Sequence, residues 1–209
     1  PIMASTIAVI VIALVGYAVC RSIPPAPAQT TEVKVDWNPI RASKSLITFS
    51  MSNPELRYSV LAISFFWTIA AILSVQFIPL AKNVLLADKQ VAAVLLVAFS
   101  AGIAIGSVSI NALLKGDISA RYSAASVLAL GGLLITFYLL CRSWNLAPDG
   151  DLFTVGEFLA RPLALALIAN LLLIAVAGGM FVVPLYAFLT TRVDKSEASR
   201  SVAANNFIS

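Results

Sequence analysis

The sequence contains no histidine and very little charge. Only 11% of its 209 residues are Asp, Glu, Lys or Arg, and 60% are hydrophobic, whereas a soluble domain is about 25% charged. Without histidine there is no imidazole proton relay, no Ser-His or Cys-His nucleophile pair and no histidine metal site. We therefore expect a membrane protein that is not an enzyme and that needs neither a metal nor another cofactor.

The formal net charge of +4 does not indicate a nucleic-acid-binding protein. The 14 Lys and Arg residues lie at the ends of hydrophobic segments and in short loops, whereas a nucleic-acid-binding domain gathers them on one face. A membrane protein shows the same excess, because its cytoplasmic loops are rich in Lys and Arg. We expect membrane lipid, and no nucleic acid, as a partner.

Five segments without a charged residue are each long enough to cross a bilayer as a helix, which takes about 20 residues. They are residues 2–20, 58–81, 90–114, 122–141 and 162–191, and a further apolar segment starts at 202. This pattern predicts an all-α membrane protein. Residues 1–57 hold one span and a linker, and residues 58–209 hold the remaining bundle. Because the chain starts at Pro1 and turns apolar as it ends, we expect a segment of a longer membrane protein.

The linker, residues 21–57, is rich in proline and charge. A short helix from Pro39 to about Met51 either lies on the membrane surface or belongs to a solvated connector. If the spans alternate in direction, ten of the 14 Lys and Arg residues fall on the linker side, which places the linker in the cytoplasm. Cys20 and Cys141 then lie at opposite membrane faces, about 30 Å apart, too far for a disulfide.

Small residues in the spans predict where helices pack closely. In the third span, Gly102 and Gly106 share one face, and small polar residues share the other: Ser100, Ala104, Ser107 and Asn111. We expect the glycine face to pack on a neighbour and the polar face to line a wet cavity. In the fourth span, Ala125, Ala129 and Gly132 form a stripe that we also interpret as packing, although small residues are common in any membrane helix.

Four residues inside the spans are candidates to line a substrate cavity: Trp67, Gln76, Asn111 and Asn170. An amide in hydrocarbon needs a hydrogen-bonding partner, so the amides either join helices or line a substrate path. The deep indole either packs or faces an acyl chain. The fifth span exceeds the hydrocarbon thickness, so it should tilt, protrude, or bend at three hinge candidates: Gly178, Gly179 and Pro184.

The order of the segments resembles the centre of a major facilitator superfamily transporter: one span, a long linker, and then several spans joined by short loops. In that superfamily, two six-helix halves are joined inside the cell. Within that superfamily, the chain is similar to the lysophospholipid transporter family, including transporter portions fused to acyltransferase and acyl-carrier-protein ligase domains. The similar segments include Asp36-Trp-Asn38, Phe66-Trp67, Gln76-Phe77, Phe99-Ser-Ala-Gly-Ile103, Val183-Pro-Leu-Tyr-Ala187 and Ala203-Ala-Asn-Asn206.

The resemblance implies a partial bundle: the last helix of the N-terminal half, the cytoplasmic linker and most of the C-terminal half. It implies a secondary transporter of the bacterial inner membrane that moves lysophospholipid, such as lysophosphatidylethanolamine, by alternating access. Two alternatives stay open. The chain is a major facilitator exporter of an amphiphilic drug or small metabolite, or it is the membrane anchor of a fused or associated acyltransferase.

Overall fold

A computed structural model describes residues 2–22, 38–115, 122–145, 148, 152–191 and 198–208. The chain divides into two compact units, Pro1–Val35 and Asp36–Ser209. The first unit contains helix α1 (Ile2–Arg21), which confirms the helix predicted over the first span. Its stretch Thr6–Arg21 is apolar but shorter than the four long helices of the second unit.

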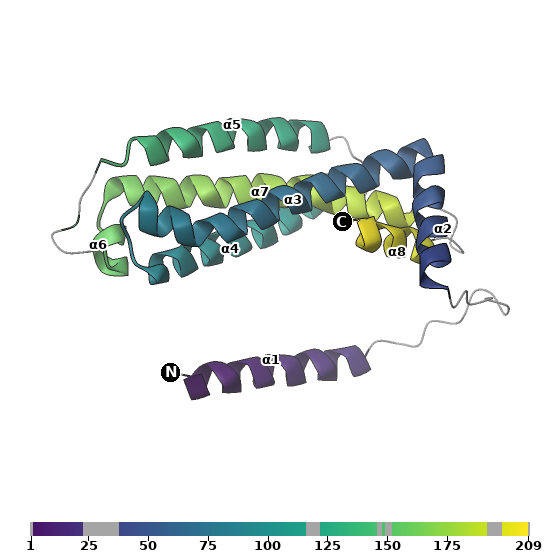
Figure 1. Cartoon of the computed structure of the whole chain (residues 1–209), viewed down its shortest axis with the longest axis horizontal. Helices are drawn as coiled ribbons and strands as arrows, with labels where there is room; N and C mark the ends of the chain where they lie inside the picture. Colours follow the sequence, from purple (N-terminus) through teal and green to yellow (C-terminus); the bar gives the residue numbers. More distant parts are fainter. Residues whose placement is uncertain are drawn as a thin grey trace. The chain divides into compact units, whose positions relative to one another are not determined.

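Four long apolar helices form the bundle of the second unit (Figure 1). They are α3 (Pro54–Asn83), α4 (Lys89–Leu114), α5 (Ser123–Arg142) and α7 (Pro162–Thr191). Each is long and apolar enough to cross a membrane, and each coincides with a predicted span. Because a helix satisfies its own backbone hydrogen bonds, it is the form in which such segments enter lipid. The chain is therefore a helical, multi-pass membrane protein.

Helix α7 lies at the centre of this bundle. It contacts α3, α4, α5 and the last helix, α8 (Ala198–Ile208), and among the described helices it is the one whose backbone α5 approaches closely. Figure 1 shows α7 running between α5 and α4. Helix α7 carries no charged residue along its whole length, and it is the most buried of the four long helices, although Leu165 and Leu173 are exposed.

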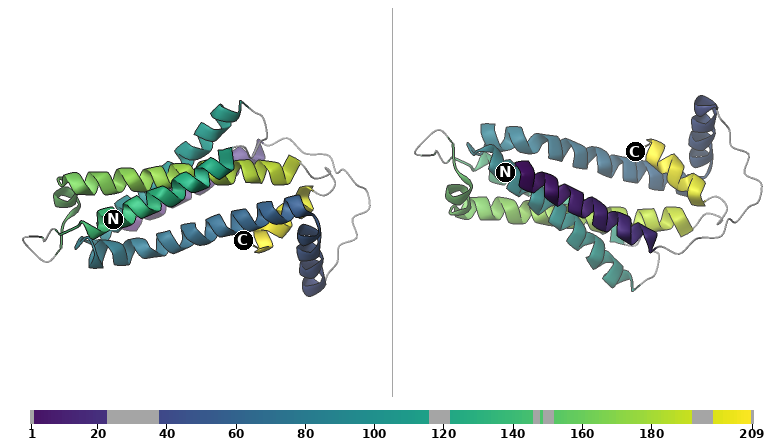
Figure 2. Two further views of the ribbon diagram at one scale, coloured as in Figure 1. Left: turned by 90° about the horizontal axis from the view of Figure 1, so that it is seen from above. Right: turned by 90° about the horizontal axis from the view of Figure 1, so that it is seen from below.

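Helix α2 (Pro39–Ser52) confirms the short helix predicted in the linker. Asn38 caps its start by accepting a hydrogen bond from the Ile40 backbone N–H at 3.1 Å. Asn53 ends it and caps α3 by accepting from the Glu55 N–H at 3.0 Å. Both Asn-Pro pairs favour helix starts. The second one forms a corner, so α2 runs across the direction of the long helices in the views of Figures 1 and 2.

Helices α4 and α7 approach closely at glycines. A Cβ atom built on Gly106 would overlap the backbone oxygen of Val176 and lie 2.9 Å from its Cα. A Cβ on Gly102 would lie 2.5 Å from the Ala175 Cβ. We call this contact, with Gly102 and Gly106 on α4, the glycine seam. The face of α4 that carries the GxxxG pattern thus lies directly on the backbone of α7.

The three hinge candidates lie within an unbroken α7 helix. A Cβ on Gly179 would lie 2.6 Å from the backbone oxygen of Ile103 in α4, and one on Gly178 would lie 2.7 Å from Cε2 of Phe66 in α3. Pro184 is buried. Both glycines therefore permit close contacts with neighbouring helices, and their role as hinges stays a prediction.

Helix α5 turns a different face to α7 from the one that its small residues suggest. The side chains that it buries are Ser123, Ser126, Leu130 and Phe137. The predicted packing stripe, Ala125, Ala129 and Gly132, is exposed, and a Cβ on Gly132 would meet nothing within 4 Å. The face that α5 turns to the bundle therefore carries Leu130 and Phe137 together with two serines, and the small stripe does not pack within the described bundle.

The segment between α5 and α7 differs from the polar loop that its charged and turn residues suggest. It contains α6 (Val155–Leu159), which starts with a capping box between Thr154 and Glu157. Its aromatic side chains are buried: Trp144, Phe153 and Phe158. The rings of Trp144 and Phe153 meet edge-on with 6.1 Å between centroids. Trp144, just beyond the end of α5, is therefore a core residue of this segment.

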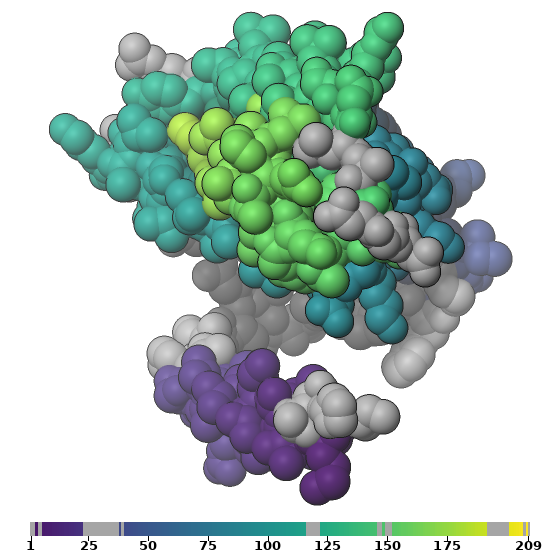
Figure 3. Space-filling model, turned by 90° about the vertical axis from the view of Figure 1, so that its left-hand side faces the viewer, coloured from purple at the N-terminus to yellow at the C-terminus, as the bar shows by residue number. Residues whose placement is uncertain are grey.

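Phe153 also ties this segment to the loop between α3 and α4. Its N–H donates to the Leu86 oxygen at 2.7 Å, and its oxygen accepts from the Asp88 N–H at 3.0 Å. Leu86 has a φ of 50°, a left-handed conformation that a leucine adopts only where the surroundings enforce it. Figure 3 views this end of the unit, where the green atoms of α6 and the start of α7 gather.

Candidate functional site

The four residues predicted to line a cavity do not lie together. Trp67 and Gln76 both belong to α3, but nine residues at about 100° each turn them to opposite faces. Asn111 is exposed on α4, and Asn170 is buried on α7. The structure therefore separates the indole from the three amides, and each position has to be considered by itself.

Trp67 belongs to a polar cluster at which α3, α7 and α8 meet. Its indole Nε1–H donates to the phenol oxygen of Tyr186 at 2.9 Å, and the Asn205 side-chain amide donates to the same oxygen at 3.4 Å. Asn205 is fully buried, whereas Trp67 is 43% exposed. We call these three residues the Tyr186 cluster. The phenol accepts both bonds, which leaves its own O–H to donate to a third partner.

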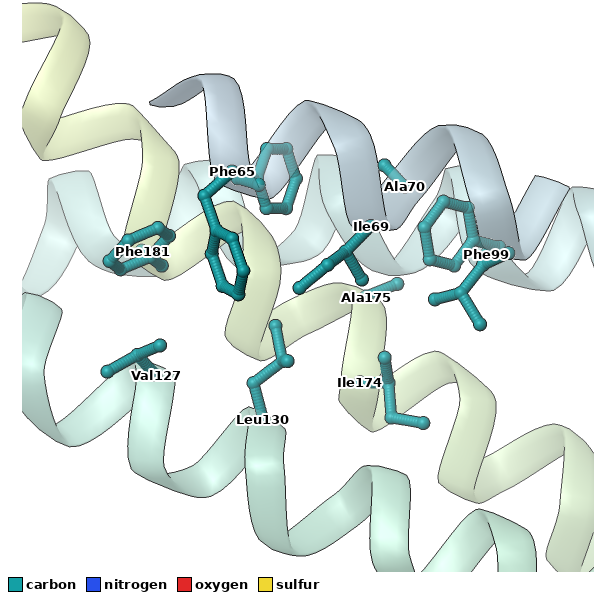
Figure 4. A pocket seen from close by; sticks show the side chains of 11 residues that line it. Phe65, Ile69, Ala70, Phe99, Val127, Leu130, Ile174, Ala175 and Phe181 are labelled. Atoms are coloured by element: carbon teal, nitrogen blue, oxygen red, sulfur yellow. The ribbon is translucent and has the colours of Figure 1, made fainter. Parts of the chain in front are cut away.

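An apolar crevice lies beside the Tyr186 cluster, between α3, α4, α5 and α7 (Figure 4). It is lined by Phe65, Phe66, Ile69, Ala70, Leu73, Phe99, Val127, Leu130, Ile174, Ala175 and Phe181. Ile69 of α3 and Leu130 of α5 point toward each other across it. The cavity volume of about 20 Å³ holds about one water molecule. An alkyl chain therefore enters only when these side chains move apart.

Phe66 connects the crevice to the polar cluster. Its ring lies 5.5 Å from the Trp67 ring and 6.4 Å from the Phe181 ring, measured between centroids. Because Phe66 lines the crevice and Trp67 bonds to Tyr186, a hydrocarbon-lined space and a hydrogen-bonding group are one aromatic ring apart. This arrangement suits a ligand that is apolar over most of its length and polar at one end.

Gln76 lines a separate, open groove between α3 and α5. The groove has a volume of about 320 Å³ and is lined by Leu73, Gln76, Phe77, Pro79, Leu80, Asn83, Val84 and Phe137. Gln76 and Asn83 are seven residues apart, which places both amides on one face of α3. Gln76 is exposed there, so its amide faces the groove surface and not a buried helix contact.

The predicted polar face of α4 is exposed except at Ser107, which is half-buried, and it directs its hydroxyls to its own backbone. Ser100 Oγ donates to the Leu96 oxygen at 2.9 Å, and Ser107 Oγ donates to the Ile103 oxygen at 2.8 Å. These bonds satisfy the hydroxyls within the helix. Asn111, the remaining polar residue of this face, is also exposed.

Asn170 is 7% exposed, and its Oδ1 has no hydrogen-bond partner among the described residues. A buried acceptor without a donor costs about 1–3 kcal/mol. In the described bundle, that oxygen makes no interhelical hydrogen bond, and a place for Asn170 on a substrate path stays a prediction.

Tyr186 and Asn205 were not selected as site residues from the sequence. The available signal was the phenol of Tyr186 inside an otherwise apolar span, because a buried tyrosine hydroxyl needs a hydrogen-bonding partner. The residues around Asn205 do not identify it as a polar group inside a span, because few apolar residues follow it in the sequence.

Comparison of the chain with protein-family models, curated protein sequences and solved structures finds no match. Within the described residues, no group of three or more His, Cys, Asp and Glu side chains could hold a metal ion. A fold alone does not define a function, so the proposal below depends on the site and on the sequence resemblance.

Proposed function

We propose that the chain is part of a secondary transporter that moves lysophospholipid, such as lysophosphatidylethanolamine, across the bacterial inner membrane. The observation that carries this proposal is the adjacency of the Tyr186 cluster and the apolar crevice, connected through Phe66 and Trp67. A lysophospholipid has one polar headgroup and a single acyl chain, and these two parts match the two neighbouring environments.

The positions of the cluster residues support the resemblance to lysophospholipid transporters. Trp67, Tyr186 and Asn205 come from three of the segments on which that resemblance rests. They are far apart in the sequence, with Tyr186 119 positions after Trp67, yet their polar groups meet at one oxygen. Three separate similar segments thus contribute to one hydrogen-bonding cluster.

In the proposed mechanism, the O–H of Tyr186 donates to an oxygen of the headgroup, and the exposed part of the Trp67 indole packs against the adjoining carbons. The acyl chain occupies the crevice once α3 and α5 move apart. Both helices contact α7, and their side chains line the crevice from opposite sides, so moving α3 and α5 apart opens it. Alternating access then exposes the site to either membrane face in turn.

The role of Tyr186 is tested by Tyr186→Phe in membrane vesicles that contain the complete protein. If the phenol binds the headgroup, uptake of radiolabelled lysophosphatidylethanolamine at subsaturating concentration should fall at least about tenfold, which corresponds to about 1.4 kcal/mol. Tyr186→Phe also removes the two interhelical bonds that the phenol accepts, worth about 0.6 kcal/mol each, or about eightfold together. A purely structural role should lower the amount of folded protein and leave uptake per folded molecule unchanged. Tyr138→Phe, at an exposed tyrosine of α5, is the matched control and should leave uptake unchanged.

The same vesicles separate the alternative functions. An exporter of amphiphilic drugs would move a single-chain cationic drug in preference to lysophosphatidylethanolamine. A membrane anchor for an acyltransferase would move neither compound. Either result, obtained with a normal amount of folded protein, contradicts the proposal.

A further inference from the structure

Helix α2 carries a basic groove that the proposed transport function does not use. It has a volume of about 410 Å³ and is lined by Arg41, Lys44, Ser45, Thr48, Phe49 and Ser52. Residues three and four apart share a helix face, so both cations and the hydroxyls form one stripe. The stripe is mostly exposed, whereas Ser50 on the other side of α2 is 1% exposed.

The position of α2 in the second unit places this groove at the level of lipid headgroups. Asn53, at the end of α2, precedes Arg57 by one helical turn, about 6 Å along α3. The Arg57 guanidinium donates to the Tyr58 hydroxyl at 3.3 Å and lies 5.0 Å above its ring. Tyr58 is 65% exposed. Arginine and tyrosine at the end of an apolar helix mark the membrane–water interface, and α2 crosses the bundle direction there (Figure 2).

An apolar edge runs alongside the basic stripe. Ile40 and Ile47 are seven residues apart, on one side of α2, and are 80% and 39% exposed. Lys44 lies between them in sequence and about 40° from Ile40 around the helix. Exposed isoleucines next to cations are the pattern of a helix that lies in the membrane plane, with its apolar edge in hydrocarbon and its cations at the phosphates.

We propose that the groove of α2 binds the headgroup of an anionic phospholipid. Arg41 and Lys44 provide the charge that a phosphodiester requires, and the hydroxyl of Thr48, between them and the end of the groove, provides a hydrogen-bond donor. The positive stripe selects a headgroup with a net negative charge over a zwitterionic one of similar size. The site is separate from the Tyr186 cluster, so it concerns a resident membrane lipid and not the transported molecule.

The experiment is native mass spectrometry of the complete protein, released from micelles that contain equal amounts of phosphatidylglycerol and phosphatidylcholine. The protein should retain phosphatidylglycerol preferentially. A cation near an anionic lipid surface contributes about 1 kcal/mol, so removing each charge should reduce retention about fivefold. Arg41→Gln combined with Lys44→Gln should therefore nearly abolish the preference, and exchanging the two residues, Arg41→Lys with Lys44→Arg, should keep it.

The matched control is Lys82→Gln combined with Lys89→Gln, which removes the same charge from the opposite end of α3 and from the start of α4. This pair should leave retention unchanged. Thr48→Lys adds a cation to the stripe and should increase retention about fivefold, so the proposal stays testable if the double substitution unfolds the protein.

Three results would overturn the proposal. They are equal retention of both lipids by the unmodified protein, an equal loss in the control pair, and unchanged retention in Thr48→Lys. Displacement of phosphatidylglycerol by millimolar inorganic phosphate, but not by chloride at equal ionic strength, would also overturn it, because the groove would then bind a soluble anion.

Discussion

Replacing Gly106 with alanine should destabilise the bundle, because the glycine seam has no room for a Cβ atom. The new atom would overlap the backbone oxygen of Val176 and lie 2.9 Å from both its carbonyl carbon and its Cα. These are backbone atoms that cannot rotate away, so α4 and α7 must separate. Overpacking costs up to about 3 kcal/mol, and alanine regains about 1 kcal/mol of helix propensity. The expected net loss is about 2 kcal/mol.

Two further glycines calibrate this value. Gly132→Ala on α5 introduces a Cβ that meets nothing within 4 Å, so helix propensity alone should make it neutral or stabilising by up to about 1 kcal/mol. Gly178→Ala would place its Cβ 2.7 Å from a ring carbon of Phe66. A side chain can turn where a backbone cannot, so this loss should be smaller than that of Gly106→Ala.

The assay is equilibrium unfolding of the purified protein in mixed micelles, followed by circular dichroism as the mole fraction of dodecyl sulfate increases. From most to least stable, the expected order of the variants is Gly132→Ala, Gly178→Ala and Gly106→Ala. Equal stabilities for Gly106→Ala and Gly132→Ala, or a more stable Gly106→Ala, would refute the close α4–α7 contact.

Three other measurements address the groove that Gln76 lines between α3 and α5, the membrane topology and the short helix α6. Gln76→Leu should reduce lysophospholipid uptake about tenfold at a normal amount of protein if Gln76 lines the substrate path, whereas unchanged uptake removes it from the site. In intact cells, a membrane-impermeant maleimide should label Cys141 and spare Cys20 in single-cysteine versions of the complete protein, and equal labelling contradicts the predicted orientation. The hydrogen bond from the Thr154 backbone N–H holds the pKa of Glu157 below its ordinary value. This contact therefore stabilises the folded protein fully above the unfolded pKa of about 4.3, and the stabilisation is lost as pH falls through the lower folded pKa. Thr154→Ala removes the hydroxyl contact and should raise that pKa, measured by carboxyl NMR titration, and an unchanged pKa contradicts the capping box.

The long helices could be predicted from the sequence, because the thickness of the hydrocarbon core and the cost of an unpaired backbone fix their length and form. The faces by which they meet were harder to predict. In lipid, a leucine gains little hydrophobic energy by leaving a lipid tail for a neighbouring helix. Gly102 and Gly106 do lie on a neighbour, but the stripe that includes Ala129 is exposed, because a small residue permits close contact without causing it.

The candidate site could be predicted only in part, because its partners are distant in the sequence. Trp67 was selected as a deep indole, but its acceptor, Tyr186, is 119 residues away, and no local spacing connects the two. The burial of Trp144 depends on distant residues in the same way. The surroundings that bury it include Phe153, whose position is set by backbone hydrogen bonds to the distant α3–α4 loop.

The central place of α7 determines when the bundle can assemble during synthesis. The ribosome makes α3, α4 and α5 before α7, yet among the described helices α7 is the one whose backbone α5 approaches closely. Until α7 enters the membrane, the glycine face of α4 lies against lipid. The Leu86 oxygen and the Asp88 N–H also lack the partner that Phe153 later provides. The first helices are therefore inserted well before they can pack, and the insertion of α7 is the step that commits the bundle to its native structure.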